Sequence, residues 1–128
     1  MLVILGVPLE LVSRMMGIKW TLHETVSFMF SDGRTLTARK GLKYDSFTAS
    51  PNLRRVDGSK SLAAGLHDWG WTNGKKDDGS MLTFDENNLA FKSVLDMEKH
   101  SDRVKKLYVW GVSLPTMRRM WRKKFGHE

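Results

Sequence analysis

The sequence predicts a single α+β domain in which a small antiparallel β-meander precedes a helical half. Three observations indicate this class. The chain of 128 residues is long enough to bury one modest hydrophobic core but too short for two. Residues 18–50 are rich in β-branched and aromatic residues with partial alternation, as strands are. Residues 59–128 carry a succession of helix start and stop signals.

Residues 1–17 predict a short apolar helix. In the segment PLELVSRMM, residues 8–16, the polar side chains occupy one narrow face, and Gly17 supplies a stop signal. Such a helix either packs on its own domain, which is the preferred alternative, or acts as an arm that docks on a neighbour. The apolar run before Arg14 has no basic region ahead of it and no small-residue cleavage site, so it makes a poor signal peptide.

The β-meander is expected within residues 18–50. The segments IKWTL, TVSFMF and TLTARKGLKYDSF each predict a strand, about three in all. Between the last two, Ser31-Asp32-Gly33-Arg34 is typical of a hairpin turn. The meander is followed by the loop TASPNLRRVDG, which Pro51 and Gly58 punctuate.

The helical core is expected within residues 59–112. A helix over 59–72 is rich in Ala and Leu and is closed by Asn73-Gly74. Thr83 and Glu86 form a capping-box pattern ahead of a second helix that extends to about residue 100. A third helix follows and is broken by Pro115. Residues 115–128 then form a basic carboxy-terminal helix.

The most suggestive motif is AAGLHDWGWTNG in the first of these helices. His67 and Asp68 are adjacent, so they point about 100° apart and need separate partners. In a hairpin of helices, Asp85 from the second helix would reach His67, fix its tautomer and leave the other ring nitrogen as a general base. Asp68 with loop carbonyls would hold a hard cation such as calcium, which would polarise a substrate carbonyl. The alternative is a hydrogen-bonded structural histidine beside a solvated carboxylate.

The last helix contains most of the excess positive charge of a chain whose net charge is +7. Its basic residues surround an aromatic side chain, and we predict a binding role for Arg118, Arg119, Arg122, Lys123 and Trp121. The alternatives are a solvated helix face, an anionic membrane surface, an acidic protein surface and nucleic acid. Nucleic acid ranks last because no recognised motif accompanies the charge.

Several motifs taken together resemble an uncharacterised family of small proteins from tailed bacteriophages and prophages, the domain of unknown function numbered 1353. The residues that carry the resemblance are Gly41, Asp45, Thr48, Pro51, Ala63, Ala64, His67, Asp68, Trp69, Trp71, Asp85 and Phe91. Three of them depart from the family pattern: Thr48 stands where the family has serine, Pro51 falls one position late, and Trp71 replaces a tyrosine. This resemblance implies a structural protein of the virion, in the tail, baseplate or neck. It also implies synthesis in the host cytoplasm and multiple copies that contact other phage structural proteins. The absence of cysteine suits a reducing compartment.

The His-Asp helix is also similar to phospholipase A2, especially the disulfide-free kind in parvoviral capsid proteins. That resemblance implies that His67 activates water, Asp68 binds calcium and Asp85 orients the histidine. The glycine-rich calcium loop of phospholipases is missing, since YDSFTASPNLRRVDG has one glycine, Gly58. Whether the chain is an enzyme therefore stays open. The alternative to a structural role is an active metal-dependent hydrolase of the host envelope, either phospholipid or cell wall, during entry or lysis.

Overall fold

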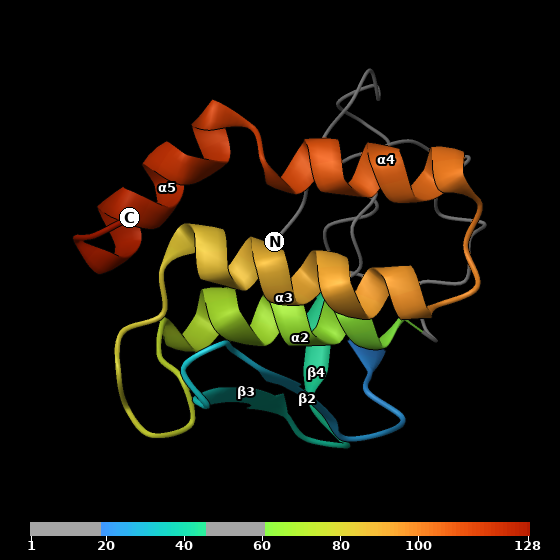
Figure 1. Ribbon diagram of the computed structural model, residues 1–128, viewed down its shortest axis with the longest axis horizontal. Coiled ribbons are helices and arrows are strands. Elements are labelled where there is room, and N and C mark those ends of the chain that lie inside the picture. The colour runs from blue at the N-terminus through green and yellow to red at the C-terminus, as the bar shows by residue number, and fades with distance from the viewer. Residues whose placement is uncertain (1–18, 46–60) are drawn as a thin grey trace.

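The computed structural model describes residues 19–45 and 61–128, and it confirms the α+β class (Figure 1). The strands are β1 (Lys19–Thr21), β2 (Val26–Met29), β3 (Thr35–Ala38) and β4 (Lys43–Asp45). The helices are α2 (Leu62–Asn73), α3 (Phe84–Met97), α4 (Asp102–Val112) and α5 (Pro115–Phe125). The expected helix within residues 1–17 and the loop with Thr48 and Pro51 lie outside the described residues.

The four strands form two antiparallel pairs, and the two strands of one pair lie between those of the other along the chain. The inner pair is the β2–β3 hairpin, whose turn closes where the Phe30 amide donates to the Arg34 carbonyl at 2.8 Å. Gly33 adopts the left-handed region with φ of 84°, as that turn requires. The outer pair joins β1 to β4, with Trp20 opposite Tyr44.

The third predicted strand is in fact two strands, β3 and β4. Gly41 has a φ of 94°, and its amide donates to the Leu22 carbonyl at 2.8 Å. The turn at Gly41 directs the following residues back toward β1, and the Leu22 amide donates to the Leu42 carbonyl at 2.8 Å. The pairing is therefore nested, and differs from a simple three-stranded meander.

Local capping signals define the helices where the sequence predicts them. The Ser61 side chain accepts a hydrogen bond from the Ala64 amide and begins α2, and Gly74 ends that helix in the left-handed region. Thr83 and Glu86 form the predicted capping box of α3, and Pro115 is in the first turn of α5. The second helix ends at Met97, slightly earlier than expected.

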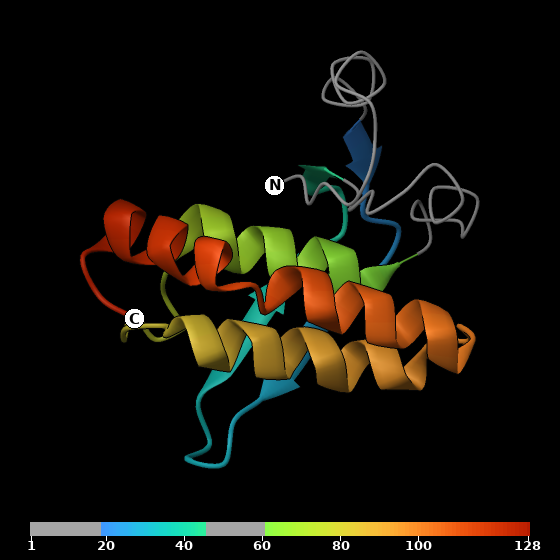
Figure 2. The same ribbon diagram turned by 90° about the horizontal axis from the view of Figure 1, so that it is seen from above.

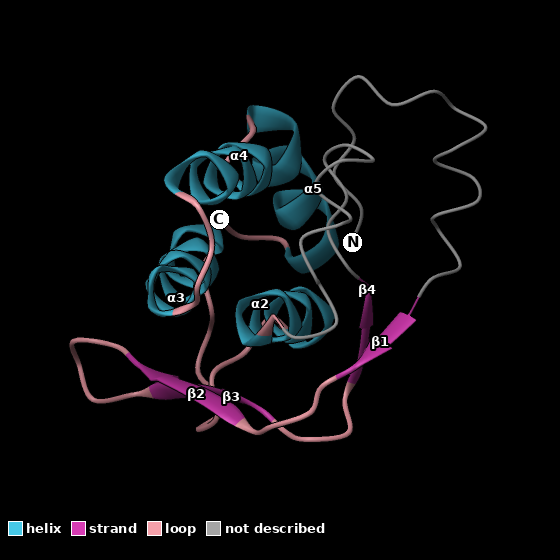
Figure 3. Ribbon diagram, turned by 90° about the vertical axis from the view of Figure 1, so that its right-hand side faces the viewer, coloured by secondary structure: helices cyan, strands magenta, loops and turns pink. Residues whose placement is uncertain are grey.

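Helix α2 is the central element of the fold. It lies between the β2–β3 hairpin on one side and the helices α3, α4 and α5 on the other (Figure 3). It packs antiparallel to α3, and α4 and α5 follow each other over this helix pair (Figure 2). The Glu98 carboxylate beyond α3 accepts hydrogen bonds at 3.1 Å from Ser61 Oγ and the Ala63 amide, which ties the open end of the α2–α3 hairpin.

Two glycines allow the close packing of α2. A Cβ on Gly65 would lie 2.6 Å from Leu22 Cδ1, and one on Gly70 would lie 1.9 Å from Asn87 Oδ1. The absence of these side chains brings the strand region and α3 against opposite sides of the helix. Side chains of the fully buried core around α2 are Leu22, Leu36, Leu66, Leu82, Phe84, Phe91, Leu95 and Trp121. Over the described ranges, every helix is too short or too polar to cross a bilayer.

Candidate functional site

The rotation of α2 places His67 in the interface with α3, where its side chain is fully buried. Its ring lies against Phe91 with centroids 4.9 Å apart and planes tilted by 58°. One turn along, the side-chain amide of the buried Asn87 donates to the His67 carbonyl at 3.2 Å. His67 is thus held from α3 through both its ring and its backbone.

The hydrogen bond of the His67 ring is made with an amide rather than a carboxylate. His67 Nε2 lies 3.1 Å from Asn88 Oδ1, and Asn88 Nδ2 donates to the Val112 carbonyl at 3.1 Å. A carbonyl can only accept, so the NH₂ group of Asn88 must be the end that faces Val112. The side-chain oxygen of Asn88 therefore faces the histidine. We therefore assign the proton to Nε2, which leaves the lone pair on Nδ1.

This environment keeps the imidazole neutral. Burial lowers the pKa of His67 from 6.5 to about 3, and the hydrogen bond that the ring donates to Asn88 Oδ1 offsets only part of that effect. A general base works best when its pKa lies near the pH of the reaction. With a pKa near 3, the ring takes up a proton too weakly to be an efficient base at neutral pH.

The predicted contact between Asp85 and His67 is wrong. The Asp85 carboxylate is mostly exposed and accepts a hydrogen bond at 2.6 Å from the guanidinium of Arg118 in α5. The reason is the register of the two antiparallel helices. His67 is level with Asn87, Asn88 and Phe91, and Asp85 lies about one turn earlier, at the start of α3.

Asp68 lies half-buried on the next stripe of α2, as helical geometry requires. Over residues 19–45 and 61–128, there is no group of three or more His, Cys, Asp or Glu side chains arranged to hold a metal ion. The loop that would supply carbonyl ligands falls within residues 46–60, outside the described part. A calcium-binding role for Asp68 therefore stays a prediction.

Trp121 is not a surface-binding residue, contrary to the prediction. Its side chain is fully buried and packs edge-on against Trp71 of α2, with ring centroids 5.0 Å apart. Its ring centroid also lies 6.1 Å from that of Phe84 and 4.5 Å from that of Phe125. The reason is amphipathicity: Trp121 and Met117 lie on the apolar stripe of α5 that faces the core of their own domain.

The basic residues of α5 are near the surface, but two of them already have anionic partners. Arg118 pairs with Asp85 and lies 3.8 Å from Glu128, and Arg122 pairs with Glu128. Arg119 donates to the Thr116 hydroxyl at 3.2 Å, and Lys123 is exposed. These contacts reduce the positive charge available for an external anion.

Sequence reasoning did not find the α2–β3 hollow, a depression of about 440 Å³ beside the other face of α2. It is bounded by Thr37 of β3, by residues 39, 40 and 42 of the β3–β4 connection, by Trp69 and Asn73 of α2, and by residues 76 and 77 of the α2–α3 loop. The only sequence signals were the adjacent cations Arg39 and Lys40 and the tryptophan, which are distant along the chain.

Comparison with protein-family models, with characterised proteins and with solved structures gives no match. The resemblances to the phage family and to phospholipase A2 therefore stay predictions.

Proposed function

We propose that this protein is a virion-associated structural component of a bacteriophage, in the tail, baseplate or neck, and that its His-Asp helix has a structural role. The observation that carries the second half of this proposal is the fully buried His67, hydrogen-bonded to the amide of Asn88. The first half is supported by the motif pattern around Ala63 and Trp69 that resembles the phage family.

The surroundings of His67 favour a structural role over hydrolysis. A histidine that activates water must become positively charged during the reaction, and a facing carboxylate stabilises that charge. The Asn88 amide is neutral and cannot do so to the same extent. Burial also disfavours the imidazolium, which agrees with the low pKa of His67. The same features suit a ring that joins two packed helices.

The surface of the described residues offers apolar contacts for neighbouring subunits. Large apolar side chains are exposed on several elements: Met29, Met81, Leu89, Met97, Trp110 and Met120. Methionine and tryptophan are enriched in protein–protein interfaces. Their exposure favours the proposal that the protein contacts neighbouring subunits in a multi-copy assembly.

The particle location is tested by quantitative mass spectrometry of gradient-purified virions from cells in which this chain is produced during phage infection. We expect the chain to co-purify at a constant ratio to the tail or head proteins through successive gradients. Recovery only in the soluble lysate, at a ratio that falls with each purification step, would overturn the structural proposal.

The competing hydrolase hypothesis is tested with anionic phospholipid vesicles and calcium. Purified protein is compared with His67→Gln, which preserves a neutral hydrogen-bond donor, and with Asp68→Asn. We expect the same background release of fatty acid from all three proteins. Release by the unmodified protein that both variants lose would establish an enzyme and remove the structural assignment of His67.

A further inference from the structure

The α2–β3 hollow has the size of a small-ligand site and is assembled from three separate parts of the chain. Its volume of about 440 Å³ is within the range of pockets that hold small molecules. The β3–β4 connection contributes Arg39 and Lys40, α2 contributes Trp69 and Asn73, and the α2–α3 loop contributes Asp77. No side chain of the His67 interface with α3 is among them.

The cations of the hollow are more available than those of α5. Arg39 and Lys40 are both exposed, and across the described ranges neither forms an ion pair within 4 Å. By contrast, Arg118 and Arg122 pair with carboxylates of this chain. Arg39 also interacts electrostatically with the Asp77 carboxylate of the hollow, but without a direct ion pair, so an external anion is expected to meet weaker competition there than at α5.

Trp69 adds a flat apolar surface beside these cations. It lies half-buried on the side of α2 that faces the strands, where Leu42 also borders the hollow. An indole ring stacks on flat aromatic groups with little dependence on their hydrogen-bonding pattern. Asn73, one turn further along α2, donates to the Lys75 carbonyl at 3.4 Å through Nδ2, and its side-chain oxygen can accept a hydrogen bond from a polar ring edge.

One wall of the hollow is held in place by a dense set of hydrogen bonds. The Asp77 carboxylate accepts bonds from the Thr35 hydroxyl at 2.6 Å, the Thr37 hydroxyl at 2.6 Å and the Thr37 amide at 2.9 Å. Since this carboxylate is occupied by three donors, it fixes the α2–α3 loop against β3. Such a fixed wall reduces the ordering that a ligand would otherwise have to impose.

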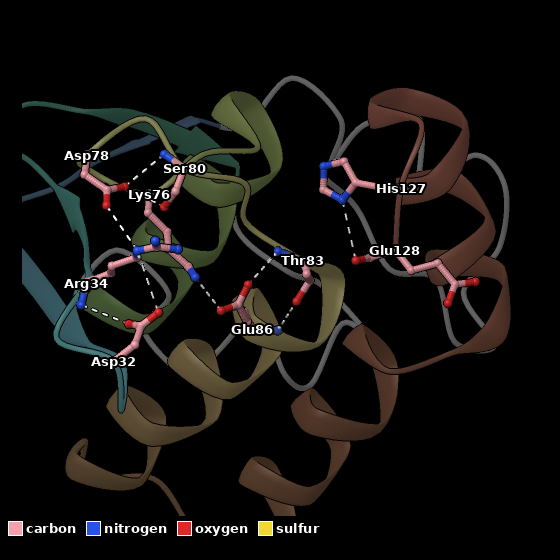
Figure 4. A network of polar contacts seen from close by, with 9 residues as sticks. All are labelled: Asp32, Arg34, Lys76, Asp78, Ser80, Thr83, Glu86, His127 and Glu128. Atoms are coloured by element: carbon pink, nitrogen blue, oxygen red, sulfur yellow. Dashed lines mark hydrogen bonds and ion pairs between the residues drawn. The ribbon is translucent and has the colours of Figure 1, made fainter.

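The neighbouring loop is held by a second polar network (Figure 4). The buried Lys76 ammonium pairs with Glu86 at 2.5 Å, and Glu86 belongs to the capping box of α3. Arg34 in the hairpin lies 3.3 Å from Asp78. The loop that borders the hollow is thus connected to both the hairpin and α3.

From this arrangement we propose that the α2–β3 hollow binds a free mononucleotide, with its phosphate at Arg39 and Lys40 and its base on Trp69. Two neighbouring cations in the lining suit a compact phosphate anion. The indole suits an aromatic base rather than a second charged group, and Asn73 can bond to the edge of the base. This site is separate from the His67 region and does not depend on the proposed virion role.

The proposal is tested by isothermal titration calorimetry of the full chain with adenosine 5′-monophosphate, adenosine and inorganic phosphate. We expect the mononucleotide to bind at least about tenfold more tightly than either fragment, because only it engages both parts of the hollow. Its affinity should weaken as salt increases, since the phosphate contacts are exposed. Equal affinities for phosphate and mononucleotide, or no binding by the mononucleotide, would overturn the proposal.

Matched variants locate the binding. Trp69→Leu and the double variant Arg39→Gln with Lys40→Gln should each weaken mononucleotide binding about tenfold or more. The controls are Trp110→Leu and the double variant Arg103→Gln with Lys106→Gln, which alter exposed side chains of α4 and should leave binding unchanged. Equal losses in the pocket and control variants would place the interaction elsewhere. Preference for a short single-stranded oligonucleotide over the mononucleotide would also contradict a free-nucleotide site.

Discussion

The two faces of α2 have opposite environments, and the residues that represent them, His67 and Trp69, are only two positions apart in the sequence. His67 faces α3, is fully buried and is bonded to Asn88, whereas Trp69 faces the strands and borders an open hollow. Residues two positions apart on a helix point about 200° apart, so this separation follows from helix geometry. The comparison teaches that His67, the residue type most often catalytic, lies on the closed face of α2. The accessible face carries Trp69 and Asn73, which are suited to binding.

The largest expected effect is a loss of stability in acid that originates on the closed face. The pKa of His67 is about 3 in the folded protein and 6.5 when exposed, so between these values the unfolded chain binds an extra proton. The contribution of His67 to the unfolding free energy is therefore fully present above about pH 6.5. Below that pH it falls by about 1.4 kcal/mol per pH unit, or roughly 4 to 5 kcal/mol by pH 3. Urea unfolding between pH 7 and pH 5 measures the first part of this slope.

The matched variants are His67→Gln and His23→Gln. The first removes the His67 ring, so it should flatten the part of the slope between pH 7 and pH 5 that His67 causes. The second removes an exposed histidine and should behave like the unmodified protein. An equal slope in all three proteins would show that His67 is not held neutral by burial.

The next largest effect is expected from Gly70→Ala, which tests the closeness of α2 and α3. A Cβ at this position would lie 1.9 Å from Asn87 Oδ1, so Asn87 must move and its bond to the His67 carbonyl would be lost. We expect a loss of about 3 kcal/mol in unfolding free energy, measured by urea denaturation. Combined with Asn87→Ala, the cost should be less than the sum of the single variants. Simple additivity would argue against direct contact.

A smaller effect is expected from Asn88→Asp, which replaces the neutral partner of His67 with a carboxylate. The negative charge favours the imidazolium, so the pKa of His67 should rise by about 1 to 2 units, or about 1.4 to 2.7 kcal/mol. Titration of the histidine ring signals by nuclear magnetic resonance measures this shift. Asp85→Asn is the control and should leave the His67 titration unchanged. A shift in that control would restore Asp85 as the orienting acid.

The smallest effect on stability is expected from Trp69→Leu on the open face. Its side chain is only half-buried and Leu preserves part of the apolar contact, so unfolding free energy should fall by less than about 1 kcal/mol. Thermal and urea unfolding measure this change beside the mononucleotide affinity. A loss as large as that of Gly70→Ala would show that Trp69 serves the core instead of the hollow.

Features specified by neighbouring residues could be predicted from the sequence. The capping box of Thr83 and Glu86, the stop at Gly74 and the start at Pro115 each depend on a few adjacent residues. The hairpin turn at Gly33 is equally local. These signals were sufficient to give the α+β class and the order of the helices from α2 to α5.

Features that depend on the register between distant segments could not be predicted. The pairing of β1 with β4 requires the turn at Gly41 to meet Leu22. The partner of His67 is Asn88 rather than Asp85 because the contact between Gly70 and Asn87 sets how far α3 slides along α2. Each candidate partner lies on the same predicted helix, so the sequence pattern alone did not distinguish them.

The position of Trp121 has a consequence for how the protein is made. This indole fills the space between Trp71 and Phe84, and Phe125 of the same helix lies against the end of α2 at Gly74. The core therefore needs residues that follow α2, α3 and α4 in the chain, and these three helices lack the cover of Trp121 until α5 has been synthesised. A nascent chain halted before α5 would present that uncovered aromatic surface to chaperones and proteases.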